Sequence, residues 1–278
     1  MYTDIISASS LNTHLKDVHW RIIDCRFSLA DTESGRRDFN QNHISGAVYA
    51  HLDDDLSGEI IKGKTGRHPL PEIEKLVEQF SVWGINEKTQ VIVYDDKGGA
   101  IAARLWWMLR WLGHERVAVL DGGWQEWLKD ELPTDNEIVD RQARFFEAKV
   151  KPEMTFNFEQ INKLKEVDDF VLVDSRAAIR YRGEEEPIDP IAGHVPNAIN
   201  LPFAENLGAN GLIKSREVLK ERFLQKTNGI APEQTAFYCG SGVTACYNLL
   251  AYHYAGLGNA RLYPGSWSEW ILEGEVAI

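Results

Sequence analysis

The chain repeats its own sequence once, and this internal repeat restricts the possible folds more than any other feature. Three segments of the first half recur in the same order in the second half, at a nearly constant offset of about 150 positions. The matching pairs are IIDCR at 22–26 with LVDSR at 172–176, HISGA at 43–47 with HVPNA at 194–198, and LDGGWQEW at 120–127 with YPGSWSEW at 263–270. Solenoid repeats have periods of only about 20–50 residues. The longer spacing here indicates the duplication of a whole domain.

The length of the chain agrees with two domains joined by a linker. Its 278 residues suffice for two domains of ordinary size, since a domain typically has about 100–200 residues. Residues 136–154 carry many charges and lack a clear hydrophobic period, which is typical of a linker. We therefore expect one domain at 1–135 and a second at 155–278.

Short apolar runs alternate with longer amphipathic segments in both halves. The runs at 91–94, 117–120, 170–173 and 235–238 are typical of buried parallel strands, and the segments at 100–112, 215–226 and 244–254 are typical of helices. Strands that alternate with helices predict an α/β fold, here two tandem domains that each hold a mostly parallel sheet flanked by helices. In such sheets ligands bind beyond the carboxyl ends of the strands.

One strand end carries the residue types of a nucleophilic site. The run at 235–238 leads directly into a loop at 239–244 (CGSGVT), and a helix follows. Glycines let such a loop curl until its backbone N–H groups point inward, and the helix N-terminus adds partial positive charge. Both effects lower the pKa of a thiol, and the thiolate is the nucleophile. The same loop would hold a persulfide anion on Cys239, beside the hydroxyl of Ser241.

Of the three cysteines, only Cys239 lies in such a loop. A lone cysteine is more often a small buried apolar residue than a nucleophile, but for Cys239 the glycine loop and the following helix favour the functional interpretation. We expect Cys25 and Cys246 to serve in packing. Three scattered cysteines are too few for a disulfide framework or a zinc cluster, which indicates a reducing compartment, the cytoplasm.

The charge balance argues against two classes of partner. The chain has 30 basic and 42 acidic residues, which leaves a net charge of −12. This disfavours nucleic acid or an anionic membrane as the main partner. The N-terminus has no basic stretch before an apolar one, and the most apolar helical segment, 100–112, is interrupted by Arg104 and Arg110 and is too short to span a bilayer. We therefore expect neither a signal peptide nor a membrane span.

Together these segments resemble the tandem rhodanese-type sulfurtransferases, over nearly the whole chain. The resemblance rests on the paired Asp-x-Arg and His-x-x-x-Ala segments, the Trp-x-x-Trp ends and the loop at 239–244. The loop sequence CGSGVT is similar to that of 3-mercaptopyruvate sulfurtransferases, whereas vertebrate thiosulfate sulfurtransferases carry two basic residues after the cysteine. The resemblance implies that Cys239 carries the sulfur. It also implies that further loop residues bind the donor, namely Gly240, Gly242, Val243 and Thr244.

The first half would lack a sulfur carrier of its own. Its strand at 91–94 is the counterpart of the strand at 235–238, and Asp95 stands where Cys239 stands in the second half. A carboxylate cannot carry sulfur, so the first domain would be non-catalytic. An inactive first domain is also what the resemblance implies.

The resemblance further implies a proton relay. In 3-mercaptopyruvate sulfurtransferases a loop serine, a histidine and an aspartate are proposed to form it, and the corresponding residues here are Ser241, His68 and Asp53. Sulfur transfer leaves the enolate of pyruvate, which must be protonated, and histidine suits that task near neutral pH. The residues alone leave simpler interpretations open. His68 can be a turn residue before proline, and Asp53 can be part of the solvated run at 53–55.

A donor carboxylate requires a cation, preferably a planar guanidinium group. The resemblance implies Arg180 for this role. The animal 3-mercaptopyruvate enzymes have a second arginine nine residues further on, where this chain has Asp189. Arg182 is one candidate replacement. Arg176 has a counterpart in the first half, which has no nucleophile, so we expect it to be a structural residue that pairs with Asp174 or with backbone carbonyls.

The resemblance thus implies that a sulfane sulfur moves from 3-mercaptopyruvate to Cys239, and from this persulfide to an acceptor such as cyanide, a small thiol or thioredoxin. No metal or organic cofactor is expected. Thiosulfate is the alternative donor, although its double charge fits the neutral Gly240 and Ser241 less well. A cysteine phosphatase would need an arginine six residues after the cysteine, where this chain has Ala245. A non-catalytic interaction module would be expected to have lost Cys239.

Overall fold

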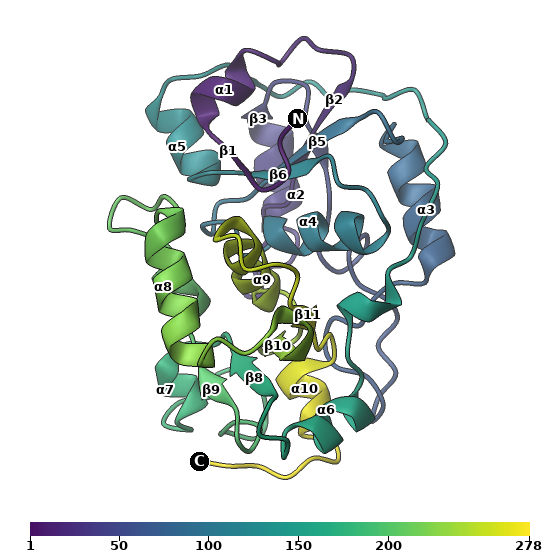
Figure 1. The fold of residues 1–278 in the computed structure, drawn as a ribbon. Coiled ribbons are helices and arrows are strands. Elements are labelled where there is room, and N and C mark those ends of the chain that lie inside the picture. Colours follow the sequence, from purple (N-terminus) through teal and green to yellow (C-terminus); the bar gives the residue numbers. More distant parts are fainter. The chain divides into compact units, whose positions relative to one another are not determined.

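The chain folds into two compact units, each assembled from two stretches of sequence. A computed structural model describes residues 1–278. Unit 1 comprises Met1–Gly58 and Pro71–Lys151, and unit 2 comprises Glu59–Leu70 and Pro152–Ile278. Each unit holds one parallel sheet flanked by helices, which confirms the predicted α/β class (Figure 1).

Unit 1 is built on a five-stranded parallel sheet of order β1-β6-β5-β2-β4. The strands are β1 (Ile5–Ile6), β2 (Trp20–Asp24), β4 (Val48–Tyr49), β5 (Gln90–Tyr94) and β6 (Val117–Leu120), with a separate antiparallel pair of β3 (His43–Ile44) and β7 (Thr134–Asp135). The helices are α1 (Ala8–Asn12), α2 (Ser34–Gln41), α3 (Ile73–Val82), α4 (Ala102–Trp111) and α5 (Gly123–Lys129). One face of the sheet packs against α1, α2 and α5 through a core that includes Ile92, Tyr94 and Trp127. Helix α4 packs on β5 and β6 outside this core and is buried along its whole length.

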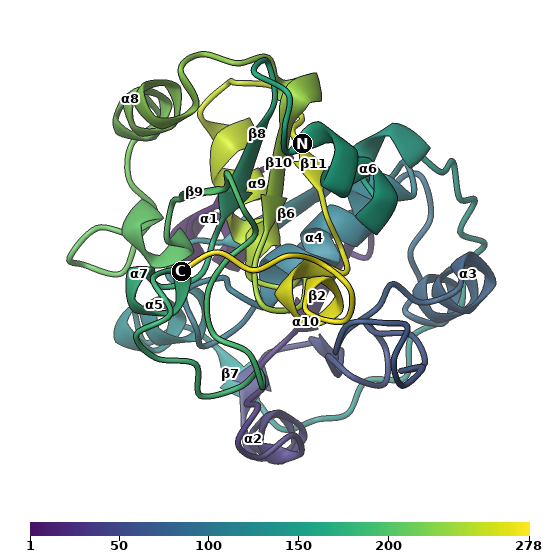
Figure 2. The same ribbon diagram turned by 90° about the horizontal axis from the view of Figure 1, so that it is seen from below.

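Unit 2 is built on a four-stranded parallel sheet of order β11-β10-β8-β9, whose strands lie side by side in Figure 2. The strands are β8 (Val171–Asp174), β9 (Ile199–Asn200), β10 (Thr235–Tyr238) and β11 (Arg261–Leu262). The helices are α6 (Phe158–Leu164), α7 (Ala178–Tyr181), α8 (Arg216–Thr227), α9 (Ala245–Tyr254) and α10 (Ser266–Trp270), with short 3₁₀ turns at Pro152–Met154, Phe203–Asn206 and Pro232–Gln234. One core joins α6 and α10 to the sheet through residues such as Tyr238 and Trp267. Helices α8 and α9 supply Phe223 and Tyr252, whose rings contact Phe237 of β10.

Local sequence explains where the elements begin and end. Helix α8 begins after Ser215, whose hydroxyl accepts a hydrogen bond from the Val218 N–H, and it ends at Asn228 in the left-handed conformation. Helix α9 is buried over nearly its whole length, which accounts for its almost uniformly apolar sequence. The predicted strands and helices are confirmed with small shifts at their ends, because capping residues and strand ends are weakly encoded.

The sequence repeat is also a structural repeat. In unit 1 the Arg26 guanidinium binds the Asp24 carboxylate, and in unit 2 Arg176 binds Asp174, with Nη2–Oδ2 distances of 2.7 and 2.6 Å. All four side chains are buried. Because the pair also occurs in the half that has Asp95 in place of the loop cysteine, the pair is a structural feature common to both repeats, as expected for Arg176.

Two segments belong to a different unit from the one that the sequence boundaries suggest. Residues 136–151, expected in the linker, pack with unit 1, where Phe146 is buried. Residues 59–70, expected in the first domain, belong to unit 2, where the Arg67 N–H donates to Ser268 Oγ at 3.0 Å. Both segments are held by scattered contacts of irregular chain, which leave no periodic pattern in the sequence.

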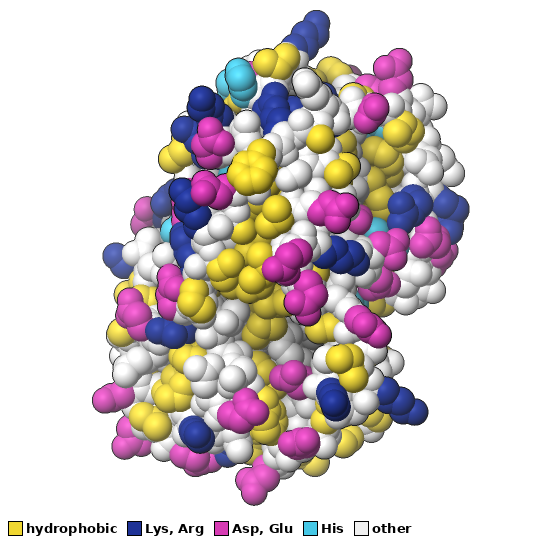
Figure 3. All heavy atoms as spheres, turned by 90° about the vertical axis from the view of Figure 1, so that its right-hand side faces the viewer, with side chains coloured by type: hydrophobic (Ala, Val, Ile, Leu, Met, Phe, Trp, Pro, Cys, Tyr) yellow, Lys and Arg dark blue, Asp and Glu magenta, His cyan; other side chains and the backbone are white.

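The surface carries charges of both signs. Figure 3 shows acidic and basic side chains interspersed over one face, so the net charge of −12 is not gathered there into a single acidic patch. None of the helices combines the length and the apolar character that a membrane crossing requires.

Candidate active site

The loop at 239–244, here called the Cys239 loop, is anchored by the start of α10. Cys239 follows β10 and is only 2% exposed. Its N–H donates to Ser266 Oγ at 3.1 Å, and its carbonyl accepts from the Trp267 N–H at 3.0 Å. The next carbonyl, that of Gly240, accepts from the Ser268 N–H at 2.9 Å. These bonds fix the backbone on both sides of the thiol.

The two glycines of the Cys239 loop are required for different reasons. Gly242 has φ +76°, and a Cβ atom there would lie 2.4 Å from the carbonyl oxygen of Pro264. A side chain is therefore excluded by conformation and by space. At Gly240 a Cβ atom would lie 2.9 Å from Nη2 of Arg67. From the sequence, we expected these glycines to let the loop curl. The structure adds a second reason, because Gly242 lies close to the Pro264 backbone and Gly240 lies close to the Arg67 guanidinium group.

Ser241 and His68 are in direct contact. Ser241 Oγ lies 2.7 Å from His68 Nδ1, and each residue is 6% exposed. His68 belongs to segment 59–70 of unit 2. Folding therefore brings together two side chains that are far apart in the sequence. The residue pair that the resemblance implied is thus brought together. A hydroxyl in contact with an imidazole can pass a proton in either direction.

Asp53 is not among the residues that unit 2 assembles. It belongs to unit 1, where it is exposed and its N–H donates to Nδ1 of His51 at 3.2 Å. A catalytic role for Asp53 stays a prediction.

An acid–base network lies against Gly240. Arg180, in α7, donates from Nε and Nη2 to the carboxylate of Glu186, at 3.1 and 2.6 Å. The same Nη2 lies 3.3 Å from Oδ2 of Asp189, whose other oxygen binds Nη1 of Arg67. A Cβ atom at Gly240 would lie 3.5 Å from Nη2 of Arg180. Two guanidinium groups therefore converge on the residue that follows Cys239.

The pKa values of the two acids of this network, Glu186 and Asp189, are shifted in opposite directions. Burial raises the pKa of Asp189 above its ordinary value, against the opposing effect of Arg67. Burial acts in the same direction on Glu186, but hydrogen bonds from Arg180 and from the Asp189 N–H outweigh it, and the pKa of Glu186 is lowered. Glu186 is thus the firm anionic partner of Arg180, and Asp189 is the acid that more readily takes up a proton.

Arg182 does not replace the arginine that is missing at position 189. Its side chain is exposed and forms an ion pair with Glu184, with Nε–Oε1 at 2.6 Å. Arg67 occupies the place beside Arg180 instead. No sequence pattern indicates Arg67, because its position beside Gly240 depends on the path of segment 59–70.

Unit 1 contains a matching loop that holds an anion of the chain itself. Asp95, at the position equivalent to Cys239, accepts hydrogen bonds from the N–H groups of Lys97, Gly99, Ile101 and Ala102 at 2.7–2.8 Å. Burial raises the pKa of Asp95, and these N–H groups oppose that effect. A loop between a strand end and a helix start in this fold can therefore surround a buried negative group with backbone donors.

Ser266 is a neighbour of Cys239 that no sequence pattern indicated. It has φ +53°, in the left-handed region that non-glycine residues rarely adopt, and its hydroxyl accepts the Cys239 N–H. Its counterpart in the repeat is Gly123, also at φ +53°, where a Cβ atom would lie 2.3 Å from Asp95 O. The difference between Gly123 in the first repeat and Ser266 in the second is the sequence feature that could have indicated this residue.

The other two cysteines are buried packing residues, as expected. Cys25 is fully buried, and burial together with nearby carboxylates, first of all that of Asp24, raises its pKa well above the ordinary value. Cys246 is also fully buried, and its Sγ lies 3.4 Å from Gly242 O.

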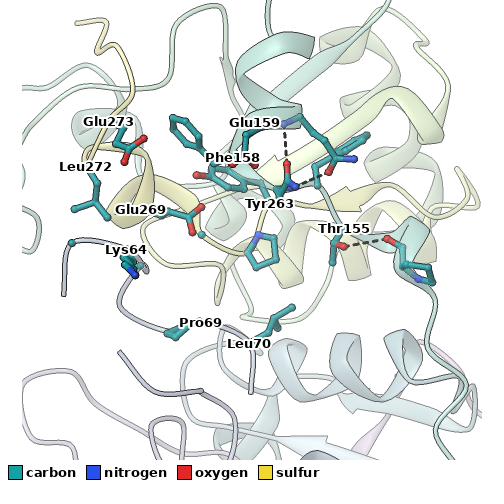
Figure 4. Close-up of a pocket in the computed structure, with 18 residues that line it drawn as sticks. Lys64, Pro69, Leu70, Thr155, Phe158, Glu159, Tyr263, Glu269, Leu272 and Glu273 are labelled. Atoms are coloured by element: carbon teal, nitrogen blue, oxygen red, sulfur yellow. Dashed lines mark hydrogen bonds between the residues drawn. The ribbon is translucent and has the colours of Figure 1, made fainter. Parts of the chain in front are cut away.

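A separate cavity of about 540 Å³ opens in unit 2 (Figure 4). Lys64, Pro69 and Leu70 lie on one side of it, and Tyr263 and Glu269 lie on the other. Further acidic and aromatic residues also line it, namely Glu159, Glu273, Phe156 and Phe158. Neither Cys239 nor Arg180 is among its lining residues, and its carboxylates would repel an anionic donor, so the cavity is not the donor site.

A family model described as a rhodanese-like domain matches the chain twice, at residues 7–130 and 157–273. The chain belongs to the rhodanese-like family, and both of its halves are rhodanese-like domains.

Proteins of this family that are similar to the chain include two kinds of sulfurtransferase. The probable 3-mercaptopyruvate sulfurtransferase of Pseudomonas aeruginosa is 41% identical, over 97% of this chain and 95% of the relative. The thiosulfate sulfurtransferase of Gallus gallus is 32% identical, over 90% of this chain and 86% of the relative. The solved structure of 3-mercaptopyruvate sulfurtransferase from Leishmania major matches with a TM-score of 0.84 at 30% identity, over 96% of this chain and 74% of that one. The chain is an enzyme of the sulfurtransferase class, as predicted.

Proposed function

We propose that this enzyme takes a sulfane sulfur from 3-mercaptopyruvate, holds it as a persulfide on Cys239 and passes it to a thiophilic acceptor. The observation that carries the proposal is the 2.7 Å contact between Ser241 Oγ and His68 Nδ1, two residues beyond the nucleophile. A donor that leaves as an enolate needs a proton relay at this place, whereas a donor that leaves as sulfite does not.

The first half-reaction balances in charge and protons. The Cys239 thiolate attacks the donor sulfur, an S–S bond forms, and the C–S bond breaks with its electron pair going to carbon. The pyruvate enolate then takes up a proton at its methylene carbon. The thiol proton of the donor supplies it, and Ser241 and His68 would carry it, leaving a Cys239 persulfide anion and pyruvate.

The persulfide anion would be stabilised by backbone donors of the Cys239 loop. Asp95 supports this inference, because in the matching loop of unit 1 it is surrounded by four N–H groups. The start of α9 adds the positive end of a helix dipole. Gly240, Gly242, Val243 and Thr244 would line the donor through this backbone, and Arg180 would bind its carboxylate.

The second half-reaction passes the outer sulfur to an acceptor. Cyanide, a small thiol or a thioredoxin-type dithiol would attack it and release the Cys239 thiolate. Such thiols prevail in a reducing compartment, and we propose the cytoplasm, in which the three free cysteines would also persist. Nucleic acid has no part in this reaction.

Thiosulfate is the second candidate donor, since a thiosulfate sulfurtransferase is among the similar proteins. It is a dianion, and sulfite leaves with two negative charges. The neutral Gly240 and Ser241 offer no side-chain cation to match it. Two acids already offset the two nearby arginines, which favours a donor with a single negative charge.

The test is kcat/KM for both donors with cyanide as acceptor, on the wild type, Cys239→Ser and the matched control Cys246→Ser. We expect 3-mercaptopyruvate to lead by about tenfold or more, no turnover in Cys239→Ser with either donor, and near wild-type activity in Cys246→Ser. A lead of thiosulfate would replace the proposed donor. Activity retained in Cys239→Ser would remove the sulfur-carrier role.

A further inference from the structure

The cavity of unit 2 in Figure 4 has the dimensions of a binding site for a small molecule. Its volume of about 540 Å³ lies within the usual range for such sites, about 300–1,000 Å³. Its walls come from residues 63–70, 152–160 and 263–273, which all belong to unit 2. Neither Cys239 nor Ser241 lines it, so the cavity is separate from the candidate active site.

The charged side chains of the cavity leave it negative. Three acids line it, Glu159, Glu269 and Glu273, against a single base, Lys64. Glu159 and Glu273 are exposed, whereas Glu269 is partly buried. The walls therefore carry an excess of two negative charges, which favours a cation as the ligand.

Glu269 is an acid without a basic partner. Gly265 leaves room for its carboxylate, since a Cβ atom at Gly265 would collide with it. Burial raises the pKa of Glu269, the Tyr263 hydroxyl opposes this effect, and the charge of Glu159 adds to it. No basic side chain is among the groups that shift this pKa. A cation from outside the chain would therefore stabilise the carboxylate.

The Tyr263 hydroxyl gives a second and independent indication of a ligand. Tyr263 is fully buried, and its Oη has no hydrogen-bond partner of ordinary distance and angle. Burial, and next the Glu269 carboxylate, raise the pKa of this phenol. Buried hydroxyl groups are nearly always hydrogen-bonded. Because Tyr263 lines the cavity, on the same side as Glu269 in Figure 4, a ligand there can supply the missing partner.

The spacing of the acids argues against a metal ion. Oxygen atoms bound to one Ca²⁺ or Mg²⁺ ion lie within about 5 Å of one another. In this chain the acids and histidines whose ligand atoms all lie within 4.8 Å of one another are Glu33, His51 and Asp54, in unit 1. The three acids of the cavity are spread more widely, as an extended cation would require.

The remaining walls suit a ligand with an apolar chain. Aromatic and aliphatic side chains line them, namely Phe156, Phe158, Pro69, Leu70 and Leu272. The faces of aromatic rings also attract ammonium groups. The cavity thus combines separated negative charges with apolar surface between its charged groups.

We propose that this cavity binds a small organic dication, a molecule in which an apolar chain joins two protonated amines. One ammonium group would bind Glu269 and Tyr263 Oη, the other would bind Glu159 or Glu273, and the chain would pack against Phe158. This inference goes beyond the proposed function and does not depend on it.

The first experiment is calorimetric titration of the whole chain, at low ionic strength, with the five-carbon diamine cadaverine. The matched ligands are the neutral five-carbon diol and glutarate, a five-carbon dicarboxylate. We expect one saturable site for cadaverine with a Kd of about 1 mM or tighter. Added salt should weaken this binding, and the diol and glutarate should not saturate the site in the same range.

Variants of the walls then test which charges hold the ligand. Glu269→Gln should raise the Kd about tenfold, the loss of one charge-assisted hydrogen bond. Lys64→Gln should lower the Kd about twofold, because it removes a positive charge from the wall. A loss of folded protein cannot produce such a tightening. Glu221→Gln, an exposed position of α8 outside the cavity, is the matched control and should bind as the wild type does.

Hydrogen exchange locates the bound ligand. Segment 63–70 carries His68, and residues 263–265 lead into Ser266, so a ligand in the cavity contacts two segments that also reach the candidate active site. We expect cadaverine to slow amide exchange in these two segments and the diol to leave it unchanged.

Four results would each overturn the inference. They are cadaverine binding no tighter than that of the diol, a Kd in Glu269→Gln within about twofold of the wild type, weaker binding in Lys64→Gln, and protection from exchange only in other segments. None of these measurements uses sulfur transfer. Failure of the proposed function has a different signature, namely a wild-type enzyme that turns over no 3-mercaptopyruvate.

Discussion

At the scale of residues, Ser241 and His68 join a loop motif to a second segment of the chain. Their contact links the hydroxyl two positions after Cys239 to an imidazole on segment 59–70. Both are buried, so the pair is shielded from competition by bulk water. A hydroxyl and an imidazole at this distance can pass a proton between them, and Ser241 lies two residues from Cys239.

Ser241→Ala separates the two donor chemistries. Loss of the hydroxyl should lower kcat/KM for 3-mercaptopyruvate by about a hundredfold, because the enolate is no longer protonated through the relay. The thiosulfate reaction releases sulfite without that proton and should fall by less than about tenfold. Steady-state rates with both donors on one preparation check this, and equal losses with both donors would contradict a relay.

The residues that sequence patterns did not indicate share one property. Arg67 and Ser266 are each placed beside the Cys239 loop by contacts that only folding supplies. Ser266 accepts the N–H of Cys239 from a strained left-handed backbone, which a serine adopts only where its surroundings hold it there. A lone serine or arginine has no local pattern from which such a role can be read.

At the scale of elements, Gly242 sets the path of the chain between β10 and α9. Gly242 turns the chain at φ +76°, with the Pro264 carbonyl oxygen directly in the path of any side chain. That carbonyl belongs to the turn that leads into α10, whose first residues anchor Cys239. The position therefore couples the loop to the element that holds it.

Gly242→Ala should therefore cost more than an ordinary positive-φ substitution. The matched control is Gly229→Ala, at φ +69° with open space around it. We expect about 1 kcal/mol of lost stability in the control, from conformation alone, and about 1–3 kcal/mol more at Gly242, from displacement of backbone. Urea unfolding of both variants checks this. Equal losses would show that the Pro264 contact is readily relieved.

The helices and strands themselves follow from local sequence. Hydrophobic period and capping residues account for β10, α8 and α9, and short apolar runs account for the central strands. Segment 59–70, expected in the first domain, groups with unit 2, and residues 136–151, expected in the linker, group with unit 1, because their attachment rests on scattered tertiary contacts. Irregular segments of this kind have no periodic hydrophobic face, so the sequence does not indicate which domain they pack against.

At the scale of the whole molecule, we expect the free energy of unfolding to depend on pH through His114, a histidine outside the candidate active site. His114, in unit 1, is buried against Phe146, and burial lowers its pKa from 6.5 to about 4. In the unfolded chain this imidazole becomes protonated as the pH falls below 6.5. In the folded chain it becomes protonated only near pH 4. This contribution to stability is therefore complete above pH 6.5 and is lost as the pH falls.

The expected loss is about 3 kcal/mol across that interval, at about 1.4 kcal/mol per pH unit. Between about pH 7.5 and about pH 5, urea unfolding of His114→Gln should lose about 2 kcal/mol less than the wild type. The exposed His19 provides the control, and His19→Gln should follow the wild-type curve. A His114→Gln curve parallel to the wild type would rule out this histidine as the titrating group.

The sequence by itself determined the duplicated α/β architecture, the position of Cys239 in a glycine loop between a strand and a helix, and the presence of Asp95 at the matching position of the first half. These features are local: a hydrophobic period, a glycine loop before a helix, and the replacement of cysteine by Asp95. Only the tertiary structure decided that His68 meets Ser241 and that Arg67, rather than Arg182, stands beside Arg180. The physical reason is that charge pairing and proton transfer depend on distances of about 3 Å. Such distances between segments far apart in the chain are set by packing alone.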